Sequence, residues 1–296
     1  MRETTNQGVA PLHCLLCGSR RHSPIFNESG IDILRCRECR HVFSSFAADP
    51  HYDRFWGEEV AEGDHFYWNK ARSRMHQDFF RRFLIGRQGR LLDIGCGLGF
   101  FLKAMTPYAN WEAYGWEISP AAGRYAHETL GLPNVICGRL EDADLQESSF
   151  DLITMWDVLE HILQPDPLLM RCQALLRERG ICFINTPNIR VQLLRAQLMK
   201  PLRGMQPGVA YLQARNHLHH YSMFSIRKLL ERNGFSRVEF VHLHPVQSVS
   251  GSKSGFLRGV KNVWFEAART LALVSRGHLN FDNLFVVAHK ESKTLR

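Results

Sequence analysis

The sequence predicts an α/β protein in which a doubly wound, mostly parallel sheet follows a small N-terminal unit. Three observations lead to this prediction. Two C-x-x-C pairs lie near the N-terminus, and apolar strand-like runs alternate with helix-like segments from Arg90 to Asn188. The first of those runs is joined to its helix by a glycine-rich turn, GCGLG at 95–99. We divide the chain into 1–48, an aromatic-rich connecting and helical segment at 49–89, and the main domain at 90–296.

The composition is that of a soluble globular protein. A length of 296 residues, with 45% hydrophobic and 22% charged residues, suits one core domain with a small appendage. The N-terminus has no apolar signal region, and no apolar run reaches about eighteen residues, so we expect a cytoplasmic protein that does not span a membrane. The net charge of +8 fits nucleic acid, anionic lipid or a phosphorylated substrate, and it also fits solubility alone.

The two C-x-x-C pairs predict a structural zinc ribbon at 1–48. Cys14 and Cys17 are separated by eighteen residues from Cys36 and Cys39. Each pair can place two thiolates on one metal, and two pairs complete a tetrahedral zinc site without an open position for catalysis. Eight cysteines stay reduced in the cytoplasm, which favours a metal over disulfides. Loss of the metal, or redox-active cysteines, is the alternative.

Short strands are expected on either side of Ser29-Gly30 in the ribbon, at 24–26 and 31–34. In the connecting segment, the apolar positions from Phe79 to Leu84 alternate with Arg81 and Arg82 and predict an amphipathic helix that packs on the main sheet. The earlier aromatic residues could cover a cofactor or line an acceptor pocket, although core packing is the commoner role; they are Tyr52, Phe55, Trp56, Phe66, Tyr67 and Trp68.

The glycine-rich turn follows a short apolar strand at 91–94 and precedes a helix from Phe100. This geometry brings a ligand close to bare backbone and a helix N-terminus. A dinucleotide-binding turn, G-x-G-x-x-G, would need glycine at 100. The observed G-x-G-x-G spacing preceded by Asp93 resembles the S-adenosylmethionine loop of class I methyltransferases.

Later segments extend this resemblance. FDLITMWDVLEHI at 150–162 and LLRERGICFINTPN at 175–188 resemble the corresponding runs of class I methyltransferases of the type 11/12/23 groups. The similarity covers the chain from about Arg90 to His289. It implies a Rossmann-like, doubly wound, mostly parallel seven-stranded sheet with helices on both faces and an antiparallel last strand.

The resemblance also implies residues that bind S-adenosyl-L-methionine. Glu117 ends the strand that starts at Trp111, where a carboxylate can accept hydrogen bonds from both ribose hydroxyls. Ser119-Pro120 then begins a helix. After the strand at 135–137, Arg139 stands where many family members have an acid, which leaves the Leu140 backbone and Glu141 or Asp142 to face the adenine. The predicted cofactor residues are Asp93, Gly95, Cys96, Gly97, Gly99, Glu117, Ile118, Leu140, Glu141 and Trp156.

A D-x-x-E-H sequence, Asp157, Glu160 and His161, lies at the end of the fourth strand. Similar E-x-x-E-H arrangements bind a divalent ion in small-RNA 2′-O-methyltransferases and in ubiquinone-pathway O-methyltransferases. Glu-His is also widespread at this place in methyltransferases that use no metal. We favour His161 as a general base, because imidazole titrates near neutral pH and can accept the proton of a hydroxyl.

The C-terminal third adds further candidates. Residues 192–208 predict a helix and loop over the site, and a helix follows at 226–233. Between them, Asn216 to Ser222 is similar to a family stretch beside the acceptor. His217, His219 and His220 are therefore candidates for proton transfer or substrate contact, with capping or packing as the alternative. The predicted catalytic residues are His161, Asp157, His217 and His220.

The stretch 253–277 predicts a basic amphipathic helical insertion before the last strand, at 284–288. Such a helix can lie on a membrane surface, but packing on its own domain or on a dimer mate is the commoner role. Membrane association therefore remains an alternative to a purely cytoplasmic location.

The function predicted from these observations is methyl transfer from S-adenosyl-L-methionine to a small-molecule or glycan acceptor, at a hydroxyl group. One alternative is an RNA methyltransferase that uses the basic surface and the ribbon, but no aromatic-and-basic single-strand-binding motif favours it. The other is a catalytically inactive binding or assembly protein, against which the intact Asp93, Gly97 and Glu117 argue. The sequence does not determine the oligomeric state.

Overall fold

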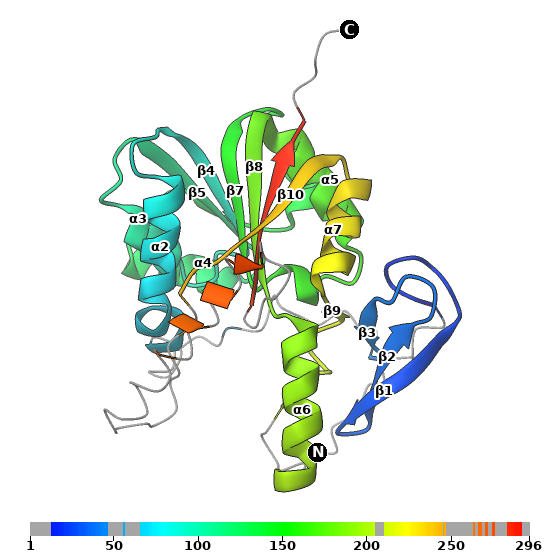
Figure 1. Cartoon of the computed structure of the whole chain (residues 1–296). Helices are drawn as coiled ribbons and strands as arrows, with labels where there is room; N and C mark the ends of the chain where they lie inside the picture. Colours follow the sequence, from blue (N-terminus) through cyan, green and yellow to red (C-terminus); the bar gives the residue numbers. More distant parts are fainter. Residues whose placement is uncertain are drawn as a thin grey trace, which may run out of the picture.

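The computed structural model describes residues 13–46, 56, 66–204, 210–244, 246, 263, 266–267, 270–271, 274–275 and 283–291. Two sheets organise this part of the chain, one of seven strands and one of four. The larger sheet lies between two layers of helices, and the smaller one lies below it and to one side (Figure 1). Among the described residues, no helix is both long and apolar enough to cross a membrane.

The seven-stranded sheet has the order β10-β11-β8-β7-β4-β5-β6. Six of these strands run in the same direction, and β11, which lies between β10 and β8, runs antiparallel to both of its neighbours. This confirms the predicted mostly parallel sheet with an antiparallel last strand. The chain winds from β4 to one edge through β5 and β6, then returns to β7 and β8, so β4 and β7 flank the switch point. The strands are β4 (Gly89–Ile94), β5 (Trp111–Glu117), β6 (Val135–Cys137), β7 (Phe150–Trp156), β8 (Leu176–Thr186), β10 (Phe235–Val241) and β11 (Leu284–Lys290).

Helices cover both faces of this sheet, with α2 (Ser73–Phe83) and α3 (Phe100–Met105) on one face and α5 (Pro165–Leu175) and α7 (Met223–Arg232) on the other (Figure 1). The apolar side of α2 packs against side chains of α3 and of the sheet, which confirms the amphipathic helix expected there. Helix α4 (Pro120–Arg124) starts as predicted, since the Ser119 side chain accepts a hydrogen bond from the Ala122 amide.

The N-terminal ribbon forms the second sheet. Its strands β1 (His22–Glu28), β2 (Ile31–Cys36) and β3 (Val42–Ser44) are antiparallel. A fourth strand, β9 (His219–His220), comes from the far end of the chain and pairs with β3. The sequence predicted β1 and β2 but not β3 or this long-range pairing.

The four ribbon cysteines form one cluster. Sγ of Cys14 lies 3.6 Å from Sγ of Cys39, and Sγ of Cys17 lies 3.6 Å from Sγ of Cys36. All four sulfur atoms lie within 4.8 Å of one another. A tetrahedral zinc ion with Zn–S bonds of about 2.3 Å places its sulfur ligands about 3.8 Å apart, so the cluster fits zinc and not a pair of disulfides.

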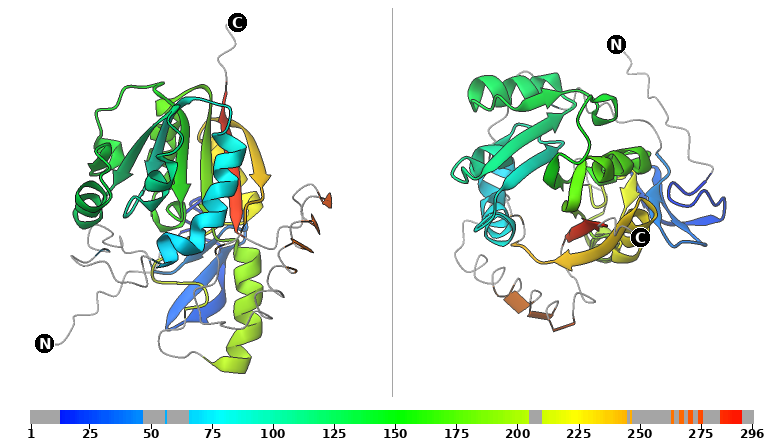
Figure 2. Two further views of the ribbon diagram at one scale, coloured as in Figure 1. Left: turned by 90° about the vertical axis from the view of Figure 1, so that its left-hand side faces the viewer. Right: turned by 90° about the horizontal axis from the view of Figure 1, so that it is seen from above.

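The ribbon and the main domain share buried surface. Ribbon residues Leu16, Leu34 and Phe43 belong to the same core cluster as Tyr221 and Leu230. Helix α6 (Ile189–Arg203) extends alongside the ribbon in the views of Figure 2, and its buried face packs on ribbon side chains. The helix expected at 192–208 to cover the site therefore covers the ribbon instead, because its apolar positions face β2 and β3.

Two predicted features lie partly or wholly outside the described residues. In the stretch 253–277, residues 263, 266–267, 270–271 and 274 are helical, and Val263, Leu271 and Val274 are exposed. Residue 275 is a turn, and the other residues of that stretch, together with Tyr52 and Phe55, fall outside the described residues. The role of 253–277 at a membrane or an interface stays a prediction.

The cysteine cluster predicts one tightly bound zinc ion per chain. Cys36→Ser should abolish zinc binding, and amides in β1–β3 should then exchange hydrogen much faster, because the metal supplies much of the ribbon's folding free energy. Elemental analysis and hydrogen exchange measure these effects. Cys137→Ser, which changes an exposed cysteine outside the cluster, is the control. A metal-free wild-type protein with a well-protected ribbon would contradict the prediction.

Candidate active site

The carboxyl ends of β4, β5 and β7 meet at one edge of the sheet. Ile94 pairs in register with Trp116 on one side and with Met155 on the other. The segments that follow these strands therefore lie together, as expected at a topological switch point. They are the glycine-rich turn at 95–99, Glu117 with its successors, and the turn from Asp157 to His161.

Two glycines in the first turn are required by close packing. Gly95 has φ +66° and Gly99 has φ +84°. A Cβ atom on Gly95 would lie 2.6 Å from a methyl group of Val158, and one on Gly99 would lie 2.7 Å from a methyl group of Leu132. Side chains at these positions would clash, so the turn brings its backbone close to its neighbours only as glycine.

Glu117 connects the turn to the end of β5. Its Oε2 accepts a hydrogen bond of 2.7 Å from the Gly97 amide, and its Oε1 accepts one of 2.8 Å from the Ser119 amide. The carboxyl group is buried, and burial raises its pKa. A carboxylate held here can also accept hydrogen bonds from the hydroxyls of a nucleoside, which is the role predicted for Glu117.

Aromatic side chains from the connecting segment lie beside the glycine-rich turn. Trp56 would contact a Cβ atom placed on Gly97 at 3.5 Å. Its ring meets that of Trp68 edge to face, with 5.9 Å between the centroids. The guanidinium of Arg72 lies 4.2 Å from the centre of the Trp68 ring. Trp56 and Trp68 also pack against the buried side chains of Leu98, Phe100 and Ala122. This confirms the core-packing alternative for these two rings, whereas a cover for a cofactor stays a prediction.

Asp157 forms a buried ion pair that the sequence did not reveal. Its Oδ2 lies 2.5 Å from Nη2 of Arg72, a side chain that is 2% exposed. Its Oδ1 accepts a hydrogen bond of 2.7 Å from the Asn185 side chain. Asp157 has φ +53°, a backbone conformation that these contacts hold in place. Both carboxylate oxygens are thus engaged within the protein, which suits a positioning role.

Glu160, His161 and His217 form a second cluster, in which one ligand atom of each lies within 4.8 Å of the others. Glu160 is 1% exposed, and its Oε2 accepts a hydrogen bond from the Thr186 hydroxyl. Its Oε1 has no hydrogen-bond partner among the described residues. Burial, reinforced by the nearby Asp157 charge, raises the pKa of Glu160 well above its usual range. A buried carboxyl group with an unused oxygen, beside two imidazoles, could hold a cation.

His161 has the features of a neutral base. Its Nδ1 donates a hydrogen bond of 2.9 Å to the Asn216 carbonyl, so in the neutral ring Nε2 bears the lone pair. Burial lowers the pKa of His161, which favours the neutral form. The His217 ring meets it edge to face, with 4.8 Å between the centroids.

The two histidines of β9 point in opposite directions, because successive side chains alternate along a strand. His220 lies toward His217, with 6.2 Å between the ring centroids, and burial lowers its pKa to about 3. His219 points toward the ribbon and hydrogen-bonds to His41. Three of the predicted catalytic residues, His161, His217 and His220, therefore lie close to one another. The fourth, Asp157, forms an ion pair with Arg72.

The remaining predicted cofactor residues differ in placement. The Trp156 ring packs in the aromatic core with Phe79, Phe101 and Phe183, away from the turn's surface, so any contact of Trp156 with a cofactor falls to its backbone. Cys96 and Leu140 are buried, and Leu140 begins a single helical turn that ends at Asp142. The side chain of Glu141 lies outside the described residues.

Sequence reasoning missed Arg72 and Asn185. Arg72 sits among ordinary helix-forming residues. Asn185, the next-to-last residue of β8, belongs to the family-like run at 175–188, but that run did not indicate a contact with Asp157. The only signal available was that a buried strand end with Asp157 needs a cationic or amide partner. That requirement does not identify which of the 37 lysines and arginines is the partner of Asp157.

Residues 67–239, more than half of the chain, match a family described as a methyltransferase domain. The fold described above is that of a class I methyltransferase. The chain belongs to the methyltransferase domain family.

Relatives and solved structures agree with this assignment. The chain is 30% identical over 108 residues to a ubiquinone biosynthesis O-methyltransferase of Neisseria meningitidis, covering 34% of this chain and 45% of that protein. A protein of the same name from Parvibaculum lavamentivorans is 32% identical over 103 residues, 33% of this chain and 40% of the relative. The chain thus spans less than half the length of these curated relatives.

Among solved structures, a SAM-dependent methyltransferase of Thermotoga maritima aligns with a TM-score of 0.51 at 17% identity, covering 81% of this chain and 98% of that one. Phosphoethanolamine N-methyltransferase 2 of Haemonchus contortus, solved with S-adenosyl-L-methionine, aligns with a TM-score of 0.50 at 18% identity, over 73% of this chain and 52% of that one. At these identities the likeness establishes the fold alone.

The buried carboxyl of Asp93, at the end of β4, predicts a pH dependence of stability. Burial raises its pKa from 3.8 to about 8, although the Thr154 hydroxyl donates a hydrogen bond of 2.7 Å to it. Between about pH 4 and pH 8 the folded protein keeps this proton and the unfolded chain loses it. The free energy of unfolding should therefore fall as pH rises through this window, by up to about 1.4 kcal/mol per pH unit from this group.

Asp93→Asn should remove that contribution. Denaturant unfolding of the ligand-free wild type and the variant at several pH values measures the difference in slope. Parallel pH dependences of the two proteins would contradict a protonated Asp93.

Proposed function

We propose that this protein transfers a methyl group from S-adenosyl-L-methionine to a hydroxyl group of a small-molecule acceptor. The main support for this proposal is that two features lie at the same edge of the sheet. The glycine-rich turn, bridged to β5 by Glu117, forms a site for a nucleoside. A neutral imidazole, His161, is held with a defined tautomer on a neighbouring strand end.

In this proposal the cofactor lies against the turn at 95–99, with Glu117 accepting hydrogen bonds from its ribose. The cofactor supplies an electrophilic methyl group. We expect the Leu140 turn and the backbone at Ile118 to border the adenine ring. Trp56 lies beside Gly97. The Haemonchus contortus enzyme, which shares this fold, was solved in complex with S-adenosyl-L-methionine, and this supports the choice of cofactor.

The chain's own chemical contribution is to position the acceptor and remove its proton. Displacement at a methyl group needs the attacking oxygen in line with the bond that breaks, so orientation provides much of the rate. Nε2 of His161 would accept the hydroxyl proton, while the Asn216 carbonyl keeps Nδ1 protonated. The carboxylate of Asp157 favours the resulting imidazolium, because its charge raises the pKa of His161.

The small-molecule hydroxyl acceptor is supported by the relatives named ubiquinone biosynthesis O-methyltransferase. A glycan hydroxyl belongs to the same chemical class and stays within the proposal. Because these matches cover only 33–34% of this chain, the particular substrate of the relatives is not assigned to it.

A second means of deprotonation is a divalent cation bound by Glu160, His161 and His217. The unpartnered Oε1 of Glu160 and the proximity of the two imidazoles favour it. Glu160, His161 and His217 would hold such a cation, which would act as a Lewis acid and lower the pKa of an acceptor hydroxyl. His217 takes the place that sequence analysis gave to Asp157, which is paired with Arg72.

The cofactor proposal predicts that Gly97→Val abolishes binding of S-adenosyl-L-methionine. A Cβ atom there would meet Trp56 at 3.5 Å and no closer neighbour among the described residues. The φ of +54° adds backbone strain, which the control variant below shares, so we expect the fold to survive while the side chain fills cofactor space. The expected loss of affinity, measured by calorimetry, is on the order of a hundredfold or more. Gly86→Val is the matched control, since Gly86 has a similar φ of +74° and nothing within 4 Å. Equal affinities in wild type and Gly97→Val would remove the basis of the proposal.

The base proposal predicts that His161→Ala lowers turnover by about a hundred- to ten-thousandfold and leaves cofactor affinity nearly unchanged. Turnover is measured with radiolabelled methyl donor on a panel of phenols, catechols and sugars. Full activity of this variant would exclude His161 as the base and direct attention to His217 or His220.

Chelation separates the base from the cation. If a divalent ion at Glu160, His161 and His217 is required, EDTA should stop turnover and magnesium or manganese should restore it. Zinc analysis of the treated protein must show that the four-cysteine site stays loaded. Turnover that EDTA does not affect excludes the cation version and retains the base.

A further inference from the structure

The segment from Tyr211 to Tyr221 carries His217 and His220 into the candidate site. Its backbone contributes no strand to the seven-stranded sheet; its two-residue strand, β9, pairs with β3 of the ribbon. Val42 pairs with His220, and Phe43 pairs with His219. The side of the site that His217 occupies is therefore attached to the ribbon.

Glu28, at the end of β1, holds the start of this segment. Its side chain is 4% exposed, and its carboxylate accepts three backbone N–H groups. Oε1 accepts from the amides of Tyr211 at 2.5 Å and Leu212 at 2.8 Å, and Oε2 accepts from that of Ala214 at 2.6 Å. Three backbone amides thus share one buried carboxyl group, so Glu28 is a polar anchor for the start of the segment.

Ser44, at the end of β3, holds the middle of the segment. Its hydroxyl donates to the Ala214 carbonyl at 2.5 Å, and its amide donates to the Leu218 carbonyl at 3.0 Å. The residue between these attachments that faces the site is His217, which is 5% exposed. The ribbon thus fixes the backbone on both sides of His217.

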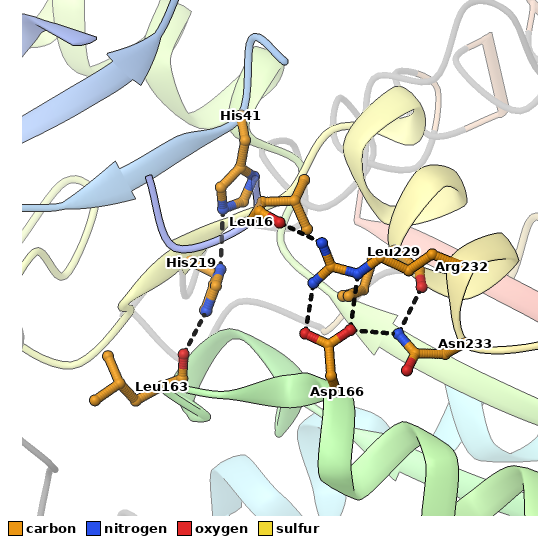
Figure 3. A network of polar contacts seen from close by, with 8 residues as sticks. All are labelled: Leu16, His41, Leu163, Asp166, His219, Leu229, Arg232 and Asn233. Carbon is orange, nitrogen blue, oxygen red and sulfur yellow. Dashed lines mark hydrogen bonds and ion pairs between the residues drawn. The ribbon is translucent and has the colours of Figure 1, made fainter. Parts of the chain in front are cut away.

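The ribbon is itself fixed to the main domain by a polar network (Figure 3). Arg232 of α7 forms an ion pair with Asp166 of α5 and also donates to the Leu16 carbonyl of the ribbon. His41 of the ribbon lies 2.9 Å from His219, which in turn contacts the Leu163 carbonyl. These contacts give the ribbon a defined orientation toward the ends of β7 and α5.

The same segment reaches the proposed base. The Leu218 amide donates to the Glu160 carbonyl at 2.9 Å, and the Asn216 carbonyl accepts the Nδ1 proton of His161. A displacement of the segment would therefore move His217 and would also release the hydrogen bond that sets the His161 tautomer.

We propose that the ribbon forms one wall of the acceptor site, and that Glu28 is a positioning residue that holds His217 and, through Asn216, the tautomer of His161. The ribbon is then a part of the active site in which its zinc serves geometry rather than chemistry. The catalytic consequence rests on the function proposed above, whereas the positioning itself can be measured without any substrate.

Hydrogen exchange of the full-length, zinc-loaded protein tests the positioning. In Glu28→Ala, the amides of Tyr211, Leu212, Ala214 and Leu218 should exchange roughly ten- to a hundredfold faster than in wild type. Glu28→Gln, which retains one acceptor oxygen and places an NH₂ group against the remaining donors, should give a smaller increase. Glu38→Gln is the control, because Glu38 lies on the same ribbon in an exposed ion pair with Arg21.

Unchanged exchange at 211–218 in Glu28→Ala would overturn the proposal. An equal increase throughout β1–β3 in both Glu28 variants would also overturn it, because Glu28 would then support the ribbon and not the segment. Zinc content, measured in parallel, should remain one ion per chain in every variant.

Turnover tests the catalytic consequence, with catechol as the first acceptor. Glu28→Ala should lower kcat about a hundredfold, with little change in the acceptor's KM or in calorimetric affinity for S-adenosyl-L-methionine, and Glu28→Gln should recover part of it. A loss of stability alone would lower activity and cofactor binding together. If no acceptor is methylated by wild type, the proposed function fails while the exchange measurement still decides the role of Glu28. Turnover in Glu28→Ala equal to wild type would leave the function standing and overturn the inference.

Discussion

The buried ion pair between Arg72 and Asp157 is the constraint on which the active-site geometry depends. Arg72 precedes α2, and Asp157 follows β7, so the pair joins the helical layer to the end of the sheet. Removal of either partner of such a pair leaves an uncompensated buried charge and costs about 3–5 kcal/mol. With Asn185 on the other carboxylate oxygen, the backbone at Asp157 keeps its left-handed conformation, and the following turn directs Glu160 and His161 toward the segment that carries His217.

That segment makes the ribbon and the methyltransferase fold one structural unit. A zinc ribbon is too small to bury much apolar surface, and here its inner side chains, such as Phe43, are completed by the core around Leu230 and Tyr221. In return the ribbon provides the only strand partner of β9 within the described chain. The boundary that we placed at residue 48 therefore divides the sequence, but the segments on its two sides share one hydrophobic core.

The sequence correctly predicted those parts of the structure whose conformation depends on neighbouring residues in the chain. The glycine-rich turn, the strand that ends at Glu117 and the two C-x-x-C pairs each specify their own conformation and lie where they were expected. What sequence could not provide depends on non-local pairing. The direction of His219 and His220 follows from their register with β3, and a shift of one residue would exchange them. Likewise, nothing local distinguishes Arg72 from a solvated helix residue, since only its burial beside Asp157 gives it a role.

The protonation states around His161 suit transfer from a cationic methyl donor. Burial raises the pKa of Glu160 and lowers those of His161 and His217, so each of these groups is shifted toward its neutral form. In the proposed reaction, the sulfonium centre of the cofactor would approach a neutral imidazole. Transfer of the acceptor's proton to His161 would place a new positive charge near Asp157, while methyl transfer would remove the charge of the sulfonium. The net charge of the site would therefore stay the same during the proposed reaction, and the positive charge would move toward the Asp157 carboxylate. Because the fold already holds this carboxylate in place, the surrounding dipoles would need little reorganisation.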